Sequence, residues 1–329
     1  MQMKFSQSKA YLNGVWQEQH ELAWSVTDLG TTQGAILVER LRTLGGKLFA
    51  VDDHLMRLSE GAEKLGIPWP ISEGGPSREG VMRDLCFELV ERNRAFVESE
   101  RDVGLVLLIS PGDPGIDRTQ SIQPTIMAHI SPLPFAQLSK WYQHGSALHF
   151  SMTRNVPAES WSPSIKTRSR LQYYLADRDL AGCVEYDVLQ SKLVETTRSR
   201  AADSVAVLLG TRNNVTETSI SNLIVLGKDG ILRSPPLTDI LWGISLKTVC
   251  ELSESTDRKI QFSEITPEHL FDANEILMTG STGCLWSAVT IDGQAIGDGR
   301  PGPVCALLQK AWQEKIGFSF VEQATQRNH

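Results

Sequence analysis

Short strand-like runs joined by tight turns are the feature that most constrains the fold. Lys9–Trp16 contains Asn13-Gly14, a pair that favours a two-residue hairpin turn because both positions tolerate positive φ. A second unit of this kind joins Gly34–Thr43 through Gly45-Gly46 to Lys47–Val51. Two strand pairs so close together predict an antiparallel sheet in the first part of the chain.

Helical spacing of apolar residues alternates with these strands. Asp52-Asp53 is expected to cap a helix over His54–Leu65, and a second helix is expected from about Arg78 to Val97. A long helical pattern runs from Ser169 to about Ala181. Further strands are predicted at Val103–Ser110, Thr125–Ile130, Ser204–Leu209, Leu223–Leu226, Glu275–Thr279 and Ser287–Ile291. The pattern as a whole predicts an α+β protein.

The length of 329 residues is enough for two domains. Two prolines within Ser131–Pro134 favour an extended connector. We therefore expect a small N-terminal domain of residues 1–131, an interdomain linker of residues 132–144 and a larger domain of residues 145–329.

Composition excludes several classes of function. The net charge is −7 and no long basic block is present, which argues against a nucleic-acid partner. The apolar runs are far shorter than the ~20 residues of a membrane span. The N-terminus lacks the apolar stretch and cleavage site of a signal peptide, and the five scattered cysteines form no metal-binding pattern. We therefore expect a cytoplasmic protein with no membrane span and no metal.

Residues that could carry chemistry have ordinary explanations when each is taken alone. Lys166, after the Pro163 turn, has the pattern of a solvated lysine at the start of a helix. Arg57 could be a cation on a helix surface, and Glu217 an exposed carboxylate. Gly243-Ile244 could simply begin a helix. None of these residues identifies a site by itself.

Taken together and in this order, the motifs resemble those of the class IV aminotransferases, the pyridoxal-phosphate enzymes of fold type IV. The resemblance runs from about Asp28 to about Leu307. Its main anchors are Leu48–Leu58, Ile165–Thr167, Val215–Asn222, Leu241–Ser245 and Thr279–Thr282. It implies a small N-terminal α/β domain, a larger domain with a mixed, barrel-like sheet, and a homodimer.

The resemblance also implies a role for each matching residue. Lys166 would form the Schiff base with pyridoxal 5'-phosphate and transfer the substrate proton, and Glu217 would face the pyridine nitrogen. The residues that would hold the phosphate or pack on the ring are Arg57, Ile244, Ser245, Thr282 and Leu241. His54 lies one turn before Arg57, and two roles stay open for it: capping the helix or ordering Arg57.

Departures from the family pattern bear on the substrate. Leu171 stands five residues after Lys166, where branched-chain aminotransferases usually have tyrosine, and this favours the D-amino-acid transaminases. Ser110-Pro111-Gly112 replaces the usual Arg-Gly turn whose arginine contacts the substrate carboxylate. Another cation is therefore needed if the substrate is an amino acid.

Arg40 is the predicted replacement. Strand alternation places Val38 and Arg40 on one face, which in the family borders the substrate pocket. An arginine there would bind the substrate carboxylate, and the alternative is a structural salt bridge. Arg168 and Arg178 are weaker candidates. The interval of 51 positions between Lys166 and Glu217 (217 − 166) is long for the family, and the extra sequence near Tyr186–Ala202 is interpreted as a solvated insertion.

The predicted function is that of a transaminase that moves an amino group from a D-amino acid to a 2-oxo acid by a ping-pong mechanism, with (R)-primary amines as further donors. An aminodeoxychorismate lyase and a branched-chain L-amino-acid aminotransferase are the alternatives within the fold. A cofactor-free binding protein that keeps the fold is the alternative from another class. The sequence does not decide the physiological substrate.

Overall fold

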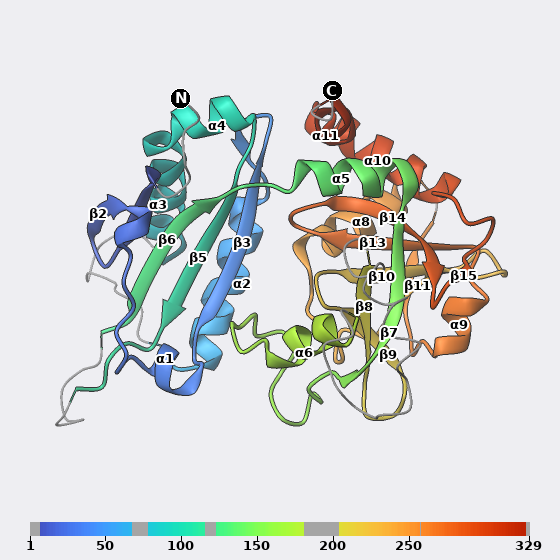
Figure 1. Cartoon of the computed structure of the whole chain (residues 1–329), viewed down its shortest axis with the longest axis horizontal. Helices are drawn as coiled ribbons and strands as arrows, with labels where there is room; N and C mark the ends of the chain where they lie inside the picture. The colour runs from blue at the N-terminus through green and yellow to red at the C-terminus, as the bar shows by residue number, and fades with distance from the viewer. Residues whose placement is uncertain (1–6, 68–77, 116–122, 181–203, 257, 327–329) are drawn as a thin grey trace, which may run out of the picture. The chain divides into compact units, whose positions relative to one another are not determined.

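A computed structural model describes residues 7–67, 78–115, 123–180, 204–256 and 258–326 (Figure 1). The chain forms two compact units. The first is Met1–Leu133 with Ile165–Ser169, and the second is Pro134–Ser164 with Arg170–His329. The boundaries expected from the sequence, 1–131, 132–144 and 145–329, remain a prediction; residues 135–144 of the expected linker form helix α5 of the second unit. The insertion expected at residues 186–202 lies outside the described residues.

The first unit is built on a six-stranded antiparallel sheet. Its strands follow the order β2-β1-β6-β5-β3-β4. They are β1 (Lys9–Leu12), β2 (Val15–Glu18), β3 (Leu37–Leu44), β4 (Lys47–Leu48), β5 (Gly104–Ser110) and β6 (Thr125–Ser131). Asn13 and Gly14 have φ angles of 46° and 92°, as the two-residue turn requires. Both predicted strand pairs and the antiparallel sheet are confirmed.

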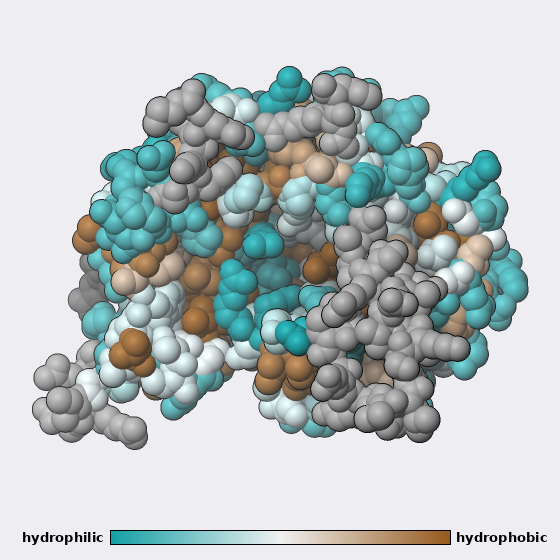
Figure 2. Space-filling view, viewed as in Figure 1, coloured by the Kyte–Doolittle hydropathy of each residue, from teal (hydrophilic) through white to brown (hydrophobic). Residues whose placement is uncertain are grey.

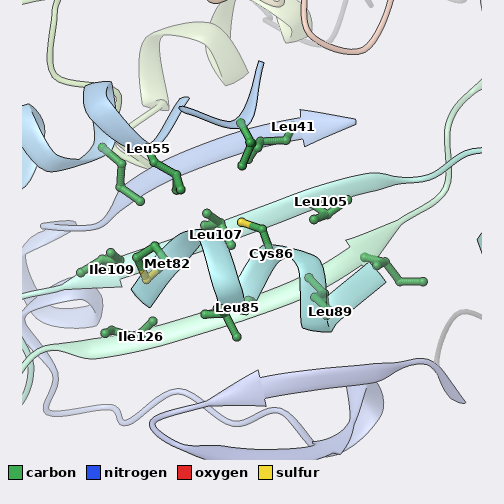
Figure 3. Close-up of a cluster of buried hydrophobic side chains, with 14 of the residues drawn as sticks. Leu41, Leu55, Met82, Leu85, Cys86, Leu89, Leu105, Leu107, Ile109 and Ile126 are labelled. Atoms are coloured by element: carbon green, nitrogen blue, oxygen red, sulfur yellow. The ribbon is translucent and has the colours of Figure 1, made fainter. Parts of the chain in front are cut away.

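Helices α2 and α3 pack on one face of this sheet and close its core (Figure 3). Leu55 of α2 and Leu89 of α3 meet Leu41, Leu105 and Leu107 of the sheet, and all five side chains are at most 2% exposed. The helices of the unit are α1 (Leu29–Gln33), α2 (Val51–Lys64), α3 (Arg78–Arg92) and α4 (Arg94–Glu100), with a short 3-10 helix at Gln19–Glu21. Of the positions that the apolar spacing predicted, Leu55, Leu58, Ala62, Leu85 and Leu89 are buried, whereas Val90 is partly buried and Leu65 is 37% exposed.

Two helix boundaries differ from the prediction. Helix α2 has Ala50 at its N-cap, and Asp52 and Asp53 lie in its first turn, where their charges still favour the helix dipole. The expected helix from Arg78 to Val97 is divided at Asn93 into α3 and α4. The cause is tertiary, because the Asn93 side chain hydrogen bonds to the backbone of Lys9 in β1.

The second unit contains a nine-stranded mixed sheet. Eight strands follow the order β12-β11-β10-β13-β14-β7-β8-β9, and β15 pairs with β14. The pairs β11·β12, β14·β7 and β7·β8 are parallel, and the other pairs are antiparallel. The strands are β7 (Ser146–Arg154), β8 (Ser204–Leu209), β9 (Val215–Thr218), β10 (Asn222–Leu226), β11 (Leu232–Ser234), β12 (Ile260–Phe262), β13 (Glu275–Gly280), β14 (Cys284–Ile291) and β15 (Gln294–Ala295). The predicted mixed sheet of an α+β protein is confirmed.

Helices complete this second unit. They are α5 (Phe135–His144), α6 (Leu171–Leu180), α8 (Ile244–Glu254), α9 (Pro267–Phe271), α10 (Pro303–Ile316) and α11 (Phe320–Gln326). Trp312 of α10 and Phe320 of α11 are almost fully buried, and their rings meet edge to face with centroids 5.9 Å apart. These large aromatic side chains help to fix the C-terminal helices.

Hydrophilic and hydrophobic residues are interspersed over the surface drawn in Figure 2. Within the described ranges, no helix is both long and apolar enough to cross a bilayer. The same ranges contain no group of three or more His, Cys, Asp or Glu side chains placed to hold a metal ion.

Candidate active site

Lys166 lies on an extended segment beside β3. Thr167 forms an antiparallel bridge with Leu37. The Val38 amide donates to the Lys166 carbonyl at 2.9 Å, and the Arg168 amide donates to the Ile36 carbonyl at 2.8 Å. The expectation that Lys166 begins a helix is therefore wrong, because pairing with β3 holds this segment extended and α6 begins only at Leu171.

The same pairing determines which way the side chains of this segment point. Ile165 packs against the buried core of the first unit, and Thr167 is opposite the core residue Leu37. Because side chains alternate along an extended chain, Lys166 and Arg168 lie on the opposite face, together with Val38 and Arg40. The structure thus brings three predicted site residues, Lys166, Val38 and Arg40, to one face of the sheet.

Arg57 belongs to a buried charged cluster on the core side of the sheet. Its Nε and Nη2 donate to the Glu39 carboxylate, each at 2.8 Å, and His54 Nδ1 lies 2.7 Å from Glu39 Oε2. Arg57 is 9% exposed, so it is not a cation of the helix surface. Glu39 links the two side chains, and of the two roles left open for His54 the geometry supports the ordering of Arg57.

The pKa shifts in this cluster arise because the Glu39 carboxylate is buried and accepts hydrogen bonds from Arg57 and His54. Burial alone would raise the pKa of Glu39, but the Arg57 charge and the hydrogen bonds from His54 and Arg57 outweigh burial and lower that pKa to about 2. Burial lowers the pKa of His54, and the charges of Arg57 and Lys166 lower it further against the opposing effect of Glu39. His54 is thus neutral and donates to Glu39. The Lys166 charge contributes to the lowered pKa of His54.

Glu217 lies on β9 of the second unit and is 7% exposed, which excludes the alternative of a surface carboxylate. The Tyr173 hydroxyl donates to its Oε1. Asn222 Nδ2, at 3.2 Å, and the Leu241 amide, at 3.4 Å, donate to its Oε2. Asn222 Nδ2 also donates to the Leu241 carbonyl at 3.0 Å. The structure therefore joins two predicted residues, Glu217 and Leu241, through Asn222.

Tyr173 is a site residue that sequence reasoning missed. Burial raises its pKa, and the Glu217 charge and hydrogen bond raise it further, so the hydroxyl stays protonated and donates. The Arg170 guanidinium lies 4.2 Å from the centre of the Tyr173 ring, and its Nη2 donates to the Ser219 carbonyl at 2.5 Å. Tyr173 comes seven residues after Lys166, outside the motifs that carried the resemblance, so no local signal identified it.

The start of α8 provides backbone donors. Gly243 is its N-cap and has no side chain to accept from the first helical amides, which include those of Ile244 and Ser245. A Cβ on Gly243 would lie 2.2 Å from Asn222 Oδ1, so only glycine fits here without a shift. A helix N-terminus of this kind attracts phosphate. Thr282 lies in the turn between β13 and β14 of the same unit.

Comparison with known proteins identifies the family. The family model of the amino-transferases of class IV matches residues 36–199 and 187–291. The chain belongs to the class IV aminotransferases. This aminotransferase is 26% identical to a D-alanine aminotransferase of Bacillus licheniformis over 309 residues, which are 94% of this chain and 97% of that protein. It is 25% identical to a putative branched-chain-amino-acid aminotransferase of Methanocaldococcus jannaschii over 93% of this chain and 96% of that one.

Solved structures share the fold. A branched-chain amino acid aminotransferase of Escherichia coli matches with a TM-score of 0.74 and 18% identity, over 95% of this chain and 94% of that chain. A T.th. branched-chain amino acid aminotransferase, complexed with N-(5'-phosphopyridoxyl)-L-glutamate, also gives a TM-score of 0.74, with 20% identity over 97% of this chain and 98% of that one. The resemblance to fold type IV is thereby confirmed.

The cofactor of this aminotransferase is pyridoxal 5'-phosphate. The described residues include groups of the kinds that fit it. The first unit has an amine at Lys166, and the second unit has a buried carboxylate at Glu217 and the amides of a helix N-terminus at Ile244 and Ser245.

Proposed function

We propose that this aminotransferase acts on D-amino acids, passing the amino group to a 2-oxo acid by a ping-pong mechanism, and that it also accepts (R)-primary amines. The observation that carries the proposal is Leu171. It begins α6 and is 67% exposed, at the position where branched-chain enzymes usually have tyrosine. The D-alanine aminotransferase relative agrees with this proposal.

We assign the amine of Lys166 two tasks: to bind the cofactor aldehyde and to move the proton from the substrate α-carbon. The bound pyridoxal phosphate supplies a ring that stabilises negative charge on that carbon. Glu217, which accepts from Tyr173, Asn222 and Leu241, presents a fixed negative charge to the pyridine nitrogen. The residues assigned to the phosphate are Arg57, Ile244, Ser245 and Thr282, and Leu241 is assigned to the ring.

Arg57 is suited to the phosphate because Glu39 fixes its orientation. A guanidinium has more N–H groups than the pair that Glu39 accepts from, and its planar fork matches phosphate oxygens. We assign the substrate side of the site to the face that carries Lys166, where Val38 and Arg40 lie. Arg40 is the one exposed residue of β3.

A branched-chain L-amino-acid aminotransferase is the second candidate. A putative enzyme of this kind is as similar in sequence as the D-alanine enzyme, and the solved structures described above are of this kind. An aminodeoxychorismate lyase stays the third candidate, on the family resemblance alone.

The deciding experiment is the absorbance spectrum of the pyridoxal-phosphate-loaded protein before and after D-alanine and, separately, L-leucine. Conversion of the visible band to the pyridoxamine form by D-alanine alone is the expected result. Conversion by L-leucine alone would establish the branched-chain candidate instead. A band that neither amino acid changes would reject both transaminase candidates and leave the lyase, which an assay with aminodeoxychorismate tests directly.

We also propose a homodimer, as the family resemblance implies. Light scattering on the purified protein should give about twice the 36.4 kDa of one chain. A mass of one chain would contradict it. The cytoplasmic location remains a prediction.

A further inference from the structure

The sheet of the first unit has a second face, opposite the core, whose residues follow from the strand register. Arg40 of β3 pairs with Val106 of β5, and Val106 pairs with His129 of β6. These three side chains therefore form one row across the sheet. Arg40 is exposed, His129 is half-buried, and Val106 between them is 1% exposed.

The segment Ile165–Ser169 extends this face by one more strand. The bridge that places Thr167 opposite Leu37 also places Lys166 opposite Val38 and Arg168 opposite Ile36. Side chains on one face of a strand are about 7 Å apart along it, so the Lys166 row lies between the rows of Arg40 and Arg168. The reactive lysine thus has an arginine on either side along the strand direction.

The charged side chains that the described strands of this sheet place on this face are cationic. In β3, β5, β6 and Ile165–Ser169, the described residues that the register assigns to this face include no Asp or Glu. The charged or titratable ones are Lys166, Arg40, Arg42, Arg168 and His129. Asp28, which lies outside these strands, accepts from Gly30, Ser110 and Thr125. Ser110 and Thr125 lie in the row of Ile36, which is also the row of Arg168.

The pKa of His129 responds to the charges of both arginines. Burial lowers its pKa, and the charges of Arg168 and Arg40 lower it further, against the hydrogen bond to the Ile130 carbonyl. His129 Nδ1 is the donor of that bond, at 2.9 Å, because a carbonyl can only accept. The bond orients the imidazole ring. Both guanidinium groups are therefore close enough to His129 to act on its charge, although they come from different strands.

We propose that Arg40 and Arg168 form a carboxylate-binding site beside Lys166, which holds the carboxylate of the amino donor and of the 2-oxo acid. The proposal rests on the transaminase function and deepens it. It names a site built within one unit of a single chain, in a protein whose Ser110-Pro111-Gly112 turn has no arginine.

The chemistry of these groups suits a carboxylate. A guanidinium binds both carboxylate oxygens through parallel N–H bonds, and such charge-assisted bonds are about twice as strong as neutral ones. Buried Val38 and Val106 give the site an apolar floor, which strengthens these electrostatic interactions.

The test is the binding of propionate, which is D-alanine without its amino group, to the loaded protein by titration calorimetry. Arg40→Gln and Arg168→Gln are compared with Arg83→Gln. Arg83→Gln is the matched control because it also removes one cation from the same unit. Arg83 lies on α3, at the other face of the sheet, where it pairs with Asp52 at 2.6 Å. Loss of a charge-assisted bond should weaken propionate binding about tenfold or more in each arginine variant. The control should bind propionate as the wild type does.

A second readout separates carboxylate binding from a structural role. The variants should raise the KM for D-alanine about tenfold or more and leave the KM for (R)-1-phenylethylamine, which has no carboxylate, unchanged. Equal losses on both substrates, or propionate binding equal to that of the control, would overturn the proposal. Weaker propionate binding in Arg40→Gln but not in Arg168→Gln would also overturn the proposal, because the two arginines would then not share a site. The propionate titration needs no turnover, so it succeeds or fails independently of the D-alanine spectrum.

Discussion

Glu39 is the buried carboxylate that accepts hydrogen bonds from Arg57 and His54 in the first unit. Its pKa in the folded protein is lowered from 4.5 to about 2, so its contribution to stability is present above pH 4.5 and is lost as the pH falls from about 4.5 to about 2. The shift of 2.5 (4.5 − 2) corresponds to roughly 3 kcal/mol of the free energy of unfolding. Denaturant unfolding between pH 7 and pH 2 should show this loss in the wild type.

The variant Glu39→Gln isolates that contribution. It leaves Arg57 buried beside a neutral amide, so at pH 7 the protein should unfold more easily, by about 3–5 kcal/mol. Between pH 4.5 and pH 2 it should lose less stability than the wild type does, because the titrating group is gone. An unchanged slope in this range would show that other carboxylates cause the pH dependence.

Tyr173→Phe tests the donor that holds Glu217. The hydroxyl donates to a buried carboxylate, and such a bond is worth about 1.5–3 kcal/mol, so the free energy of unfolding should fall by about this amount. Tyr174→Phe is the matched control, since Tyr174 is 57% exposed and the change should have an effect below about 0.5 kcal/mol. Equal effects of the two variants in denaturant titrations would mean that the Glu217 bond contributes nothing to stability.

The site residues differ in how far the sequence could predict them. The sequence motifs singled out Lys166, Glu217 and Arg57, and the structure shows two of these buried and the third beside β3. Tyr173 and His129 could not be found this way. The fold alone brings Tyr173 to Glu217 and places His129 in the row of Arg40, because these residues are distant in sequence.

At the scale of elements, the sequence predicts what local chemistry determines. The Asn13-Gly14 turn needs positive φ and carries its own signal, so its hairpin was predictable. The division of the expected helix at Asn93 was not. It depends on hydrogen bonds between residues 84 positions apart in the chain. The pairing of Ile165–Ser169 with β3 is likewise a long-range contact, and no local sequence pattern predicts it.

Asn93→Ala therefore tests whether the tertiary bonds maintain the break between α3 and α4. The side chain accepts from the Lys9 amide at 2.7 Å and donates to the carbonyls of Lys9 and Leu89. Removing bonds that satisfy buried backbone groups should lower the free energy of unfolding by about 2 kcal/mol or more. Arg94→Ala, next to it, removes only an exposed ion pair with Glu91 and should cost less than about 1 kcal/mol. Comparable losses in thermal or denaturant unfolding would assign the break to local sequence instead.

At the scale of the whole molecule, the cofactor should stabilise the folded chain. A ligand that binds only the folded state adds RT ln(1 + [L]/Kd), which is about 2.7 kcal/mol at a concentration of 100 Kd. The melting temperature of the wild type should therefore rise when pyridoxal phosphate is added. Lys166→Ala should lose the visible absorption band of the covalently held cofactor and much of this thermal gain, because the bond to Lys166 contributes to the affinity.

Lys47→Ala gives the matched control for that experiment. Lys47 is an exposed lysine at the start of β4 in the same unit, so its removal should leave both the band and the thermal gain as in the wild type. A band that survives in Lys166→Ala would assign covalent binding to another lysine and remove the central residue of the proposed site. Thermal gain without a band would mean that the phosphate is still bound, in line with the proposed roles of Arg57 and the start of α8, and that Lys166 supplies the covalent bond alone. The two readouts thus separate recognition of the phosphate from capture of the aldehyde in one protein.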